Sequence, residues 1–479
     1  MAALFAFSAA GCSKKDDASS SPLDPKNPVT ITVWHYYNGL QQTGFDKMVE
    51  EFNETRGREL GIVVEGHSQG SVSQLGEAVS AAAVKKVGSE KMPNIFGAYA
   101  DQAYSYAQKD MLVDLSQYLS DDELSGYIPS YIEEGKIGTN GELVIFPIAK
   151  STEVFMINKT KWDEFSAACG VSEDELSTVE GLVEVSEIYY NWTDSLTPDI
   201  KDDGKAFFGR DSMANLMILG AMQLKTEIFS VNGGKVTLNT DKEAFRRLWD
   251  TYYVPYINGY FTKNGRFCSD DMKVGDIVGY IGSSSSAGYF PEEVIEGENS
   301  SPIESWVLPV PVFENGEKYA VQQGAGMVVV KSTEAEEYAS VEFLKWFTEE
   351  SRNIKFSYSS GYLPVKTAAN NYDMVKAAVE ESGEEMPKVV DKALKVAIKQ
   401  TADYKLYTNK AFNNGGKARD VLENSLQGLC EKDRQTILDR VSAGEDKKAV
   451  VSEFTTDEHF EEWYESVCNE LTVSVGSQN

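Results

Sequence analysis

Two hydrophobic periods alternate along the N-terminal part of the chain. Between residues 29 and 33, valine and isoleucine alternate with threonine, as in a half-buried β-strand. From 45 to 52, apolar side chains recur every third or fourth residue, which is the spacing of one helix face. Apolar runs at 62–64 and 94–99 predict two further strands. Strand, helix and strand in succession indicate an α/β fold with a parallel sheet.

Three later stretches break this order, and each predicts a crossing between two lobes. The first is 149–153, which extended apolar runs flank, and the second is 279–288, a strand that ends in small residues. The third is 361–365, a Gly-Tyr-Leu-Pro-Val sequence that follows a helical pattern. We therefore expect lobe 1 at 29–148 plus 284–360, and lobe 2 at 149–283 plus 361–479.

The N-terminus predicts export and lipid attachment. Cys12 follows a short apolar run and precedes the polar stretch 13–28, which is the layout of a bacterial lipoprotein signal. We expect residues 1–11 to be removed, Cys12 to carry lipid, and 12–28 to form a flexible tether on the outer face of the cell membrane. No Lys or Arg precedes Cys12, although export signals begin with one, so a chance cysteine in a frayed terminus is the alternative. No later apolar run approaches the roughly 20 residues of a spanning helix.

Composition narrows the function classes. The chain has 479 residues, 42% of them hydrophobic, as in a packed globular protein of two or three domains. Its 75 acidic and 45 basic residues give a formal net charge of −30, which repels phosphate backbones and argues against nucleic acid as a partner. The four cysteines after Cys12 show no zinc spacing, and we expect buried free thiols, with a Cys430–Cys468 disulfide as the alternative.

None of the catalytic motifs considered below is complete in this sequence. The three histidines show no H-E-x-x-H spacing, and no G-x-S-x-G sequence is present. Gly416-Lys417 resembles a phosphate loop, but Ala411 and Ala418 stand where Gly and Ser or Thr are required. Acidic pairs such as Glu133-Glu134 are expected by chance in so acidic a chain. We therefore predict no enzyme, no cofactor and no metal, with a secreted glycoside hydrolase as the competing class.

Ordered motifs resemble a known family. The chain is similar to family 1 extracellular solute-binding proteins of ABC importers, the group that contains maltodextrin- and sn-glycerol-3-phosphate-binding proteins. The resemblance implies a two-lobed α/β fold of the periplasmic-binding-protein type II, with three hinge crossings and the ligand in the cleft between the lobes. The matching segments, in order, are 31–35, 92–96, 141–148, 153–158, 278–284, 306–311, 324–331, 341–347 and 361–365.

The resemblance also implies ligand contacts. Relatives contact their ligand with a serine after the first crossing, a serine loop, a glycine-containing loop, a tyrosine and an arginine. The matching residues here are Lys150, Ser151, Ser283, Ser284, Ser285, Gln323, Gly324, Tyr362 and Arg419. Two contacts of the glycerol-phosphate relatives are not retained: their tyrosine after the second strand is replaced near Ser71, and their acid after the third strand is replaced by Ala100, with Asp101 adjacent. These departures favour a different, larger sugar. A plain linker for the serines and an ion pair with surface acids for Arg419 are the alternatives.

Two more groups of candidate ligand-binding residues follow from the sequence itself, independently of the family resemblance. Ligands of open α/β sheets bind beyond the carboxyl ends of the strands, and sugars need an aromatic face together with polar groups. Tyr36 and Tyr37 follow the first strand and are candidates, whereas Trp34 is expected in the core. Asp211, Ser212 and Asn215 follow another strand, with a helix N-cap at Asp211 as the alternative.

The expected function is extracellular binding of a saccharide and its delivery to ABC permease subunits. The protein is expected to act as a monomer that its N-terminal lipid holds at the membrane. A lipoprotein that senses sugar for a signalling receptor would have the same fold and stays an alternative.

Overall fold

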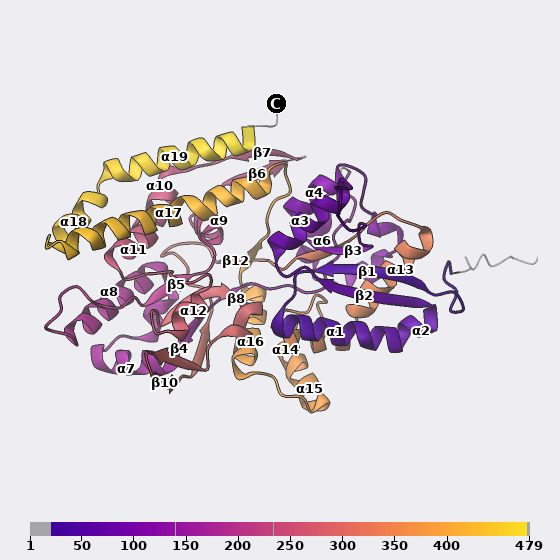
Figure 1. The fold of residues 1–479 in the computed structure, drawn as a ribbon, viewed down its shortest axis with the longest axis horizontal. Coiled ribbons are helices and arrows are strands. Elements are labelled where there is room, and N and C mark those ends of the chain that lie inside the picture. The colour runs from indigo at the N-terminus through magenta and orange to yellow at the C-terminus, as the bar shows by residue number, and fades with distance from the viewer. Residues whose placement is uncertain (1–20, 139, 233, 477–479) are drawn as a thin grey trace, which may run out of the picture.

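Two four-stranded sheets form the centres of two lobes, which lie side by side in Figure 1. The computed structural model describes residues 21–138, 140–232 and 234–476. Cys12 and the predicted signal lie outside the described residues. The α/β prediction is confirmed, because each sheet is covered by helices on its faces.

The first lobe has the strand order β13-β3-β1-β2. β1 is parallel to β2 and β3, and β13 returns antiparallel to β3. The alternation predicted for β1 is observed, since Ile31 and Val33 are fully buried while Thr30 and Thr32 are not. The strands are β1 (Val29–His35), β2 (Ile62–Ser68), β3 (Ile95–Ala98) and β13 (Gly326–Val329).

Aromatic contacts hold the helices of this lobe to its sheet. Phe45 and Phe52 of α1 contact Phe343 of α13, edge to face, with ring centroids 6.4 and 5.1 Å apart. Such edge-to-face pairs add about 0.5–1.5 kcal/mol each beyond the area they bury. The helices are α1 (Gly39–Glu54), α2 (Arg56–Leu60), α3 (Val72–Ala83), α4 (Ala100–Ala107), η1 (Leu115–Gln117), α5 (Asp121–Ser125), α6 (Pro129–Gly135), α13 (Glu334–Phe347) and α14 (Glu350–Ser360).

The second lobe has the strand order β11-β4-β8-β5. β4 is antiparallel to both neighbours, and β5 is parallel to β8. Short two-stranded ribbons surround this sheet. The strands are β4 (Glu153–Asn158), β5 (Phe208–Arg210), β6 (Phe229–Asn232), β7 (Lys235–Leu238), β8 (Gly279–Ser283), β9 (Glu293–Glu296), β10 (Asn299–Pro302), β11 (Ser305–Leu308), β12 (Tyr319–Val321) and β14 (Lys405–Tyr407).

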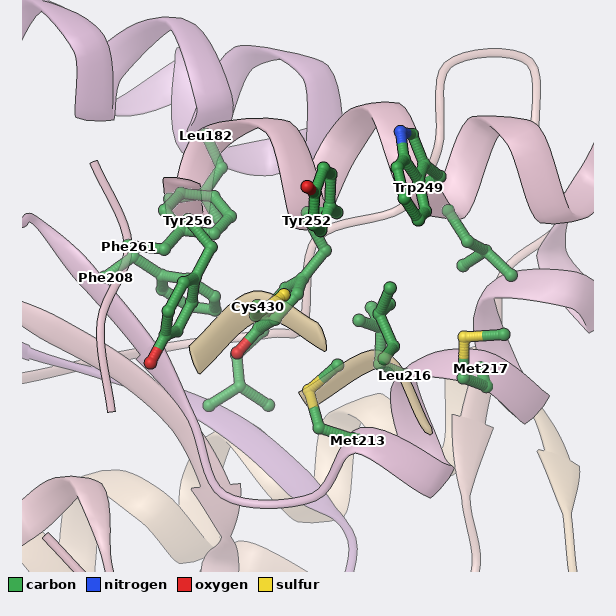
Figure 2. Packing of buried hydrophobic residues seen from close by; sticks show 14 of the residues in the cluster. Leu182, Phe208, Met213, Leu216, Met217, Trp249, Tyr252, Tyr256, Phe261 and Cys430 are labelled. Carbon is green, nitrogen blue, oxygen red and sulfur yellow. The ribbon is translucent and has the colours of Figure 1, made fainter. Parts of the chain in front are cut away.

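Helices enclose the core of the second lobe. Figure 2 shows Met213 and Leu216 of α9 packed beneath Trp249 and Tyr252, with Cys430 of α17 beside them. The long helices α17 and α19 form the outer layer of Figure 1. The helices are α7 (Lys159–Cys169), η2 (Glu173–Ser177), α8 (Val179–Ser195), α9 (Met213–Gln223), α10 (Lys242–Leu248), η3 (Trp249–Tyr253), α11 (Val254–Asn258), α12 (Cys268–Lys273), η4 (Ser284–Tyr289), α15 (Tyr372–Ser382), α16 (Lys388–Asp403), α17 (Gly415–Ser442), α18 (Lys447–Phe454) and α19 (Asp457–Gly476).

The second crossing lies later than the sequence indicated. β8 pairs with β4, and so does β11, so the stretch 284–321 stays with the second sheet and the expected place of 284–360 in lobe 1 is wrong for this part. The small residues after β8 start a 3₁₀ helix, in which the Ser283 hydroxyl accepts from the backbone N–H of Ser285. The chain returns to the first sheet after Val321, at β13.

The crossing segments lie side by side and are joined by backbone hydrogen bonds. Ser151 N–H donates to the carbonyl of Gln323 at 2.8 Å, and Lys150 N–H donates to that of Leu363 at 3.1 Å. Gly324 has φ +94°, and a Cβ there would lie 2.9 Å from the Ala149 carbonyl oxygen. Only glycine therefore lets the second crossing approach the first so closely.

Three properties of the described residues concern membrane, metal and thiol chemistry. None of their helices is long and apolar enough to span a membrane. They contain no cluster of His, Cys, Asp and Glu that could hold a metal ion. Among them Cys268 and Cys430 are buried free thiols, as expected, whereas Cys169 and Cys468 are free but only half-buried, and the alternative Cys430–Cys468 disulfide is not formed.

Candidate functional site

A cleft between the lobes is lined by residues of both. One part, of about 1000 Å³, contains the serines that follow β8, and we call it the serine compartment. The adjoining part, of about 1400 Å³, contains Arg419, and we call it the arginine compartment. Val72, Tyr99 and Gln323 line both compartments, so the two are continuous.

Three tyrosines bring aromatic rings and hydroxyls to the serine compartment. The Tyr36 and Tyr362 hydroxyls are 3.3 Å apart, and Ala325 N–H donates to the Tyr36 oxygen at 3.2 Å. Tyr99 is the third tyrosine, and its phenol interacts electrostatically with that of Tyr36. Burial raises the pKa of all three phenols well above its usual value. The hydroxyls therefore stay protonated and can donate and accept hydrogen bonds.

Serines and two contacts between the lobes form another part of the lining of the serine compartment. The Ser283 and Ser285 hydroxyls are 2.9 Å apart, at the carboxyl end of β8. Gln41 of α1 donates its amide N–H to the Ser285 carbonyl at 2.9 Å. The Tyr289 hydroxyl donates to the Asn38 side-chain oxygen at 2.6 Å. Groups from both lobes thus meet in this part of the lining.

A buried polar network supports the wall of the arginine compartment, which Asn215 and Arg419 of this network line. Arg419 Nη2 donates to Asn215 Oδ1 at 2.7 Å and to Ser212 Oγ at 3.4 Å. Asn215 Nδ2 donates to Glu153 Oε1 at 2.8 Å, and Arg210 Nη2 donates to Glu153 Oε2 at 2.6 Å. Burial is the main influence on the Glu153 carboxyl and raises its pKa, which the neighbouring Arg210 and Asn215 counteract. The network joins β4, β5, α9 and α17.

Most of the sequence-predicted residues line the cleft. The structure brings them together from loops that are far apart in the chain. Those in the serine compartment are Tyr36, Ser151, Asp211, Ser283, Ser285, Gln323, Gly324 and Tyr362, and those in the arginine compartment are Asp101, Asn215, Gln323 and Arg419.

Five predicted residues lie elsewhere. Tyr37 is buried in the core and packs against Phe45 and Phe356. Trp34 is buried as well, as expected. Ser71 and Ser212 cap the N-termini of α3 and α9, so the N-cap expected at Asp211 is one residue later.

The remaining two, Lys150 and Ser284, are held beneath the cleft. Lys150 is 1% exposed, and its Nζ donates to Glu134 Oε2 at 2.6 Å and to the Gly324 carbonyl at 2.9 Å. Ser284 is fully buried, and its oxygen lies 3.4 Å from Thr152 N. These side chains stabilise the crossings.

Several cleft residues were not predicted from the sequence. Tyr99 follows β3, so the rule that singled out the loop after the first strand applies to it equally. Tyr289 and Phe267 belong to short irregular elements that no hydrophobic period marks. The further cleft residues include Asn38, Gln41, Val72, Asp270, Lys273, Asn409, Asp420 and Glu423.

The arrangement is suited to reversible binding of a polar solute. Hydroxyls and amides supply donors and acceptors, and the tyrosines supply rings for the apolar face of a ligand. A two-lobed α/β fold with such a cleft defines a solute receptor. A family model described as bacterial extracellular solute-binding protein matches residues 47–382, and the chain belongs to that family. Membership implies a place outside the cytoplasm.

Solved structures show the same fold at low sequence identity. The cyclic α-maltosyl-1,6-maltose binding protein of Arthrobacter globiformis is 18% identical, with 94% of this chain and 100% of that one covered at a TM-score of 0.65. UgpB of Mycobacterium tuberculosis, in complex with glycerophosphocholine, is 15% identical over 92% and 99%, with a TM-score of 0.67.

A third neighbour is an ABC substrate-binding protein of Listeria monocytogenes in complex with cycloalternan. It is 14% identical over 94% of this chain and 100% of its own, with a TM-score of 0.67. No curated protein matches the chain at the same level of significance. At these identities the likeness defines the fold, and that fold is the expected two-lobed one.

Proposed function

We propose that the protein binds a carbohydrate in the cleft and delivers it to the permease of an ABC importer, without altering it. The observation that carries this is the cleft lining, where the rings of Tyr36, Tyr99 and Tyr362 lie beside the Ser283 and Ser285 hydroxyls. A saccharide presents an apolar ring face and many hydroxyls, and this lining complements both. Two of the three structural neighbours are described by the saccharide that they bind, which agrees with the proposal.

Of the sixteen ligand-binding residues predicted from the sequence, five do not line the cleft and are left out of the proposal. We propose as ligand-binding those that line the two compartments, together with Tyr99, Asn38 and Gln41. We propose that the lobes move relative to each other about 150–152, 322–325 and 361–364, where backbone hydrogen bonds join the crossings. Such short connections allow a hinge to close around a ligand that contacts both lobes.

A thermal-shift screen of mono-, di- and oligosaccharides tests the binding. A saccharide at 100 times its Kd should stabilise the native protein by about 2.7 kcal/mol. Tyr36→Phe removes a cleft hydroxyl and should weaken that binding by about tenfold, because Ala325 N–H loses its acceptor and the sugar loses a partner. Tyr37→Phe is the matched control, since the neighbouring ring is buried in the core.

Two results would contradict the proposal. One is that no saccharide in the screen stabilises the protein. The other is a hydrolysis product in the same mixtures, detected by chromatography, which would favour a glycoside hydrolase instead.

We also propose that Cys12 carries lipid and that the protein works as a monomer tethered to the outer face of the membrane. The support is the sequence around Cys12 together with the extracellular family. Residues 12–28 serve as the tether and allow the receptor to reach both solute and permease.

A further inference from the structure

We infer that the cleft selects against anionic saccharides, and that Arg419 supports the cleft wall and does not bind an anion. The inference rests on the proposed function and names the ligand class of the same site. It departs from what the family resemblance implies for Arg419, because a contacting arginine in relatives of the glycerol-phosphate type suggests an anionic ligand.

The hydrogen bonds of Arg419 are the first reason. Its Nη2 donates to Asn215 Oδ1 at 2.7 Å and to Ser212 Oγ at 3.4 Å, and its Nη1 donates to Asn409 Oδ1 at 3.2 Å. An anion clamp presents the two parallel N–H groups of a guanidinium to the ligand. Here both terminal nitrogens are directed at side chains of the protein itself.

The carboxylates around Arg419 are the second reason. Asp101 and Asp420 line the same compartment, and the pKa of Asp101 is raised mainly by burial, with Asp420 adding to the rise and Arg419 opposing it. Glu423 lies on the far side of Ser212, whose hydroxyl donates to it at 3.1 Å. The positive charge of Arg419 is thus shared among acids that an incoming anion would also meet.

The charge of the whole cleft is the third reason. Across both compartments eight acidic residues stand against four basic ones, a formal difference of four negative charges. Three of the four basic residues (Lys86, Arg266 and Lys273) and five of the eight acidic ones are exposed, where salt screens their charges. The groups that are not exposed are Asp101, Asp211 and Glu423 against Arg419, so the excess charge stays negative. The acidic residues are Glu77, Asp101, Asp211, Asp270, Glu292, Glu293, Asp420 and Glu423.

These features favour an uncharged ligand. Sugar hydroxyls can donate to the cleft carboxylates, which only accept, and can accept from the protonated tyrosines. A phosphate or carboxylate on the sugar cannot donate to these acids at neutral pH and is repelled by them. The same chemistry admits neutral saccharides and disfavours sugar phosphates and uronic acids.

Matched pairs of saccharides test the inference by calorimetric titration of the full protein. The pairs are glucose with glucose 6-phosphate, galactose with galacturonate, and maltotriose with trigalacturonate. For any pair that binds, we expect the neutral member to bind at least about tenfold more tightly. An anionic member that binds equally or more tightly overturns the inference and leaves the proposed function intact.

A second measurement needs no saccharide to bind. The Nε–H signal of Arg419, assigned by NMR with the Arg419→Lys variant, is followed during titration with inorganic phosphate. We expect no saturable shift, because the guanidinium is directed at Asn215 and Asn409. A saturable shift overturns the inference even if the saccharide panel has failed, so the two failures can be distinguished.

A variant tests the role of the acids directly. Asp420→Asn should raise the affinity for an anionic member relative to its neutral partner by about 2- to 30-fold, for a charge at roughly 8 Å and effective dielectric constants between about 80 and 20. The rise should shrink with added salt. Glu462→Gln on α19 changes the net charge equally but lies outside the cleft, and should leave the ratio unchanged. An unchanged ratio in Asp420→Asn overturns the role of Asp420.

Discussion

At the scale of single residues, a buried charged side chain can support the binding site without contacting the ligand. Lys150 and Glu134 form an ion pair of 2.6 Å, with side chains only 1% and 5% exposed. Gln322 also hydrogen-bonds Glu134, so the pair ties the first two crossings to α6. A lysine in such a place fixes the geometry of the hinge without meeting the solute.

Lys150→Met should lower the free energy of unfolding by about 3–5 kcal/mol, because it leaves the Glu134 carboxylate buried without its counter-charge. Urea denaturation measures this. The double variant Lys150→Met/Glu134→Leu should recover most of the loss, since it removes both charges.

The control is a second Lys–Glu pair, at the C-terminal end of α6. Lys136 pairs with Glu133, but their side chains are 42% and 65% exposed. Lys136→Met should therefore cost no more than about 1 kcal/mol. Equal losses from Lys150→Met and Lys136→Met would contradict the role assigned to the buried pair.

At the scale of elements, the start of α17 lies close to α4 of the other lobe. A Cβ built on Gly415 would lie 3.3 Å from Asp101 Cβ, and one on Gly416 would lie 3.5 Å from Asp101 Oδ2. The segment 413–416 leads into α17, which begins at Gly415. The structure shows that its glycines also allow the two lobes to approach across the arginine compartment.

Gly416→Val should weaken binding of the saccharide found in the screen by about tenfold, or ~1.4 kcal/mol, because the branched side chain would meet Asp101 as the lobes approach. Titration calorimetry measures the affinity, and circular dichroism checks that the helix is retained. Gly428→Val lies on the same helix, and a Cβ there would meet nothing within 4 Å. That control should leave the affinity unchanged. Equal affinities for the two variants would mean that α17 does not limit closure.

At the scale of the whole molecule, the proposed tether and the two-lobed receptor have separate tasks. The receptor carries a formal charge of −30, and its described helices include none that could span a membrane. The proposal attaches the protein to the membrane through Cys12, which lies outside the described residues.

Cys12→Ser should release the protein from the membrane fraction of the native host into the medium, because the thiol that accepts the lipid is gone. Fractionation with labelled palmitate measures this, and the label should be lost together with the attachment. Cys169→Ser is the control, since Cys169 lies in the second lobe and should not affect either readout. A Cys12→Ser protein that stays with the membrane would sink the lipid proposal.

Much of the fold could be predicted because local periods reflect burial in this chain. The alternation at 29–33 and the helix spacing at 45–52 follow directly from which side chains face the core. The second crossing was misplaced because a strand that ends in serines has the same local composition whether the chain then changes lobe or caps a 3₁₀ helix. Only the pairing of β11 with β4 distinguishes the two.

For the candidate site, too, some features follow from the sequence and others only from the tertiary structure. Sequence by itself determined the α/β class, the family resemblance and the segments that supply Tyr36, Ser283 and Arg419, because residue type and order carry those. Tertiary structure alone decided that Tyr37 and Lys150 turn away from the cleft, and that Arg419 is directed at Asn215. These outcomes depend on burial and on partners more than a hundred residues away, and no local pattern encodes them.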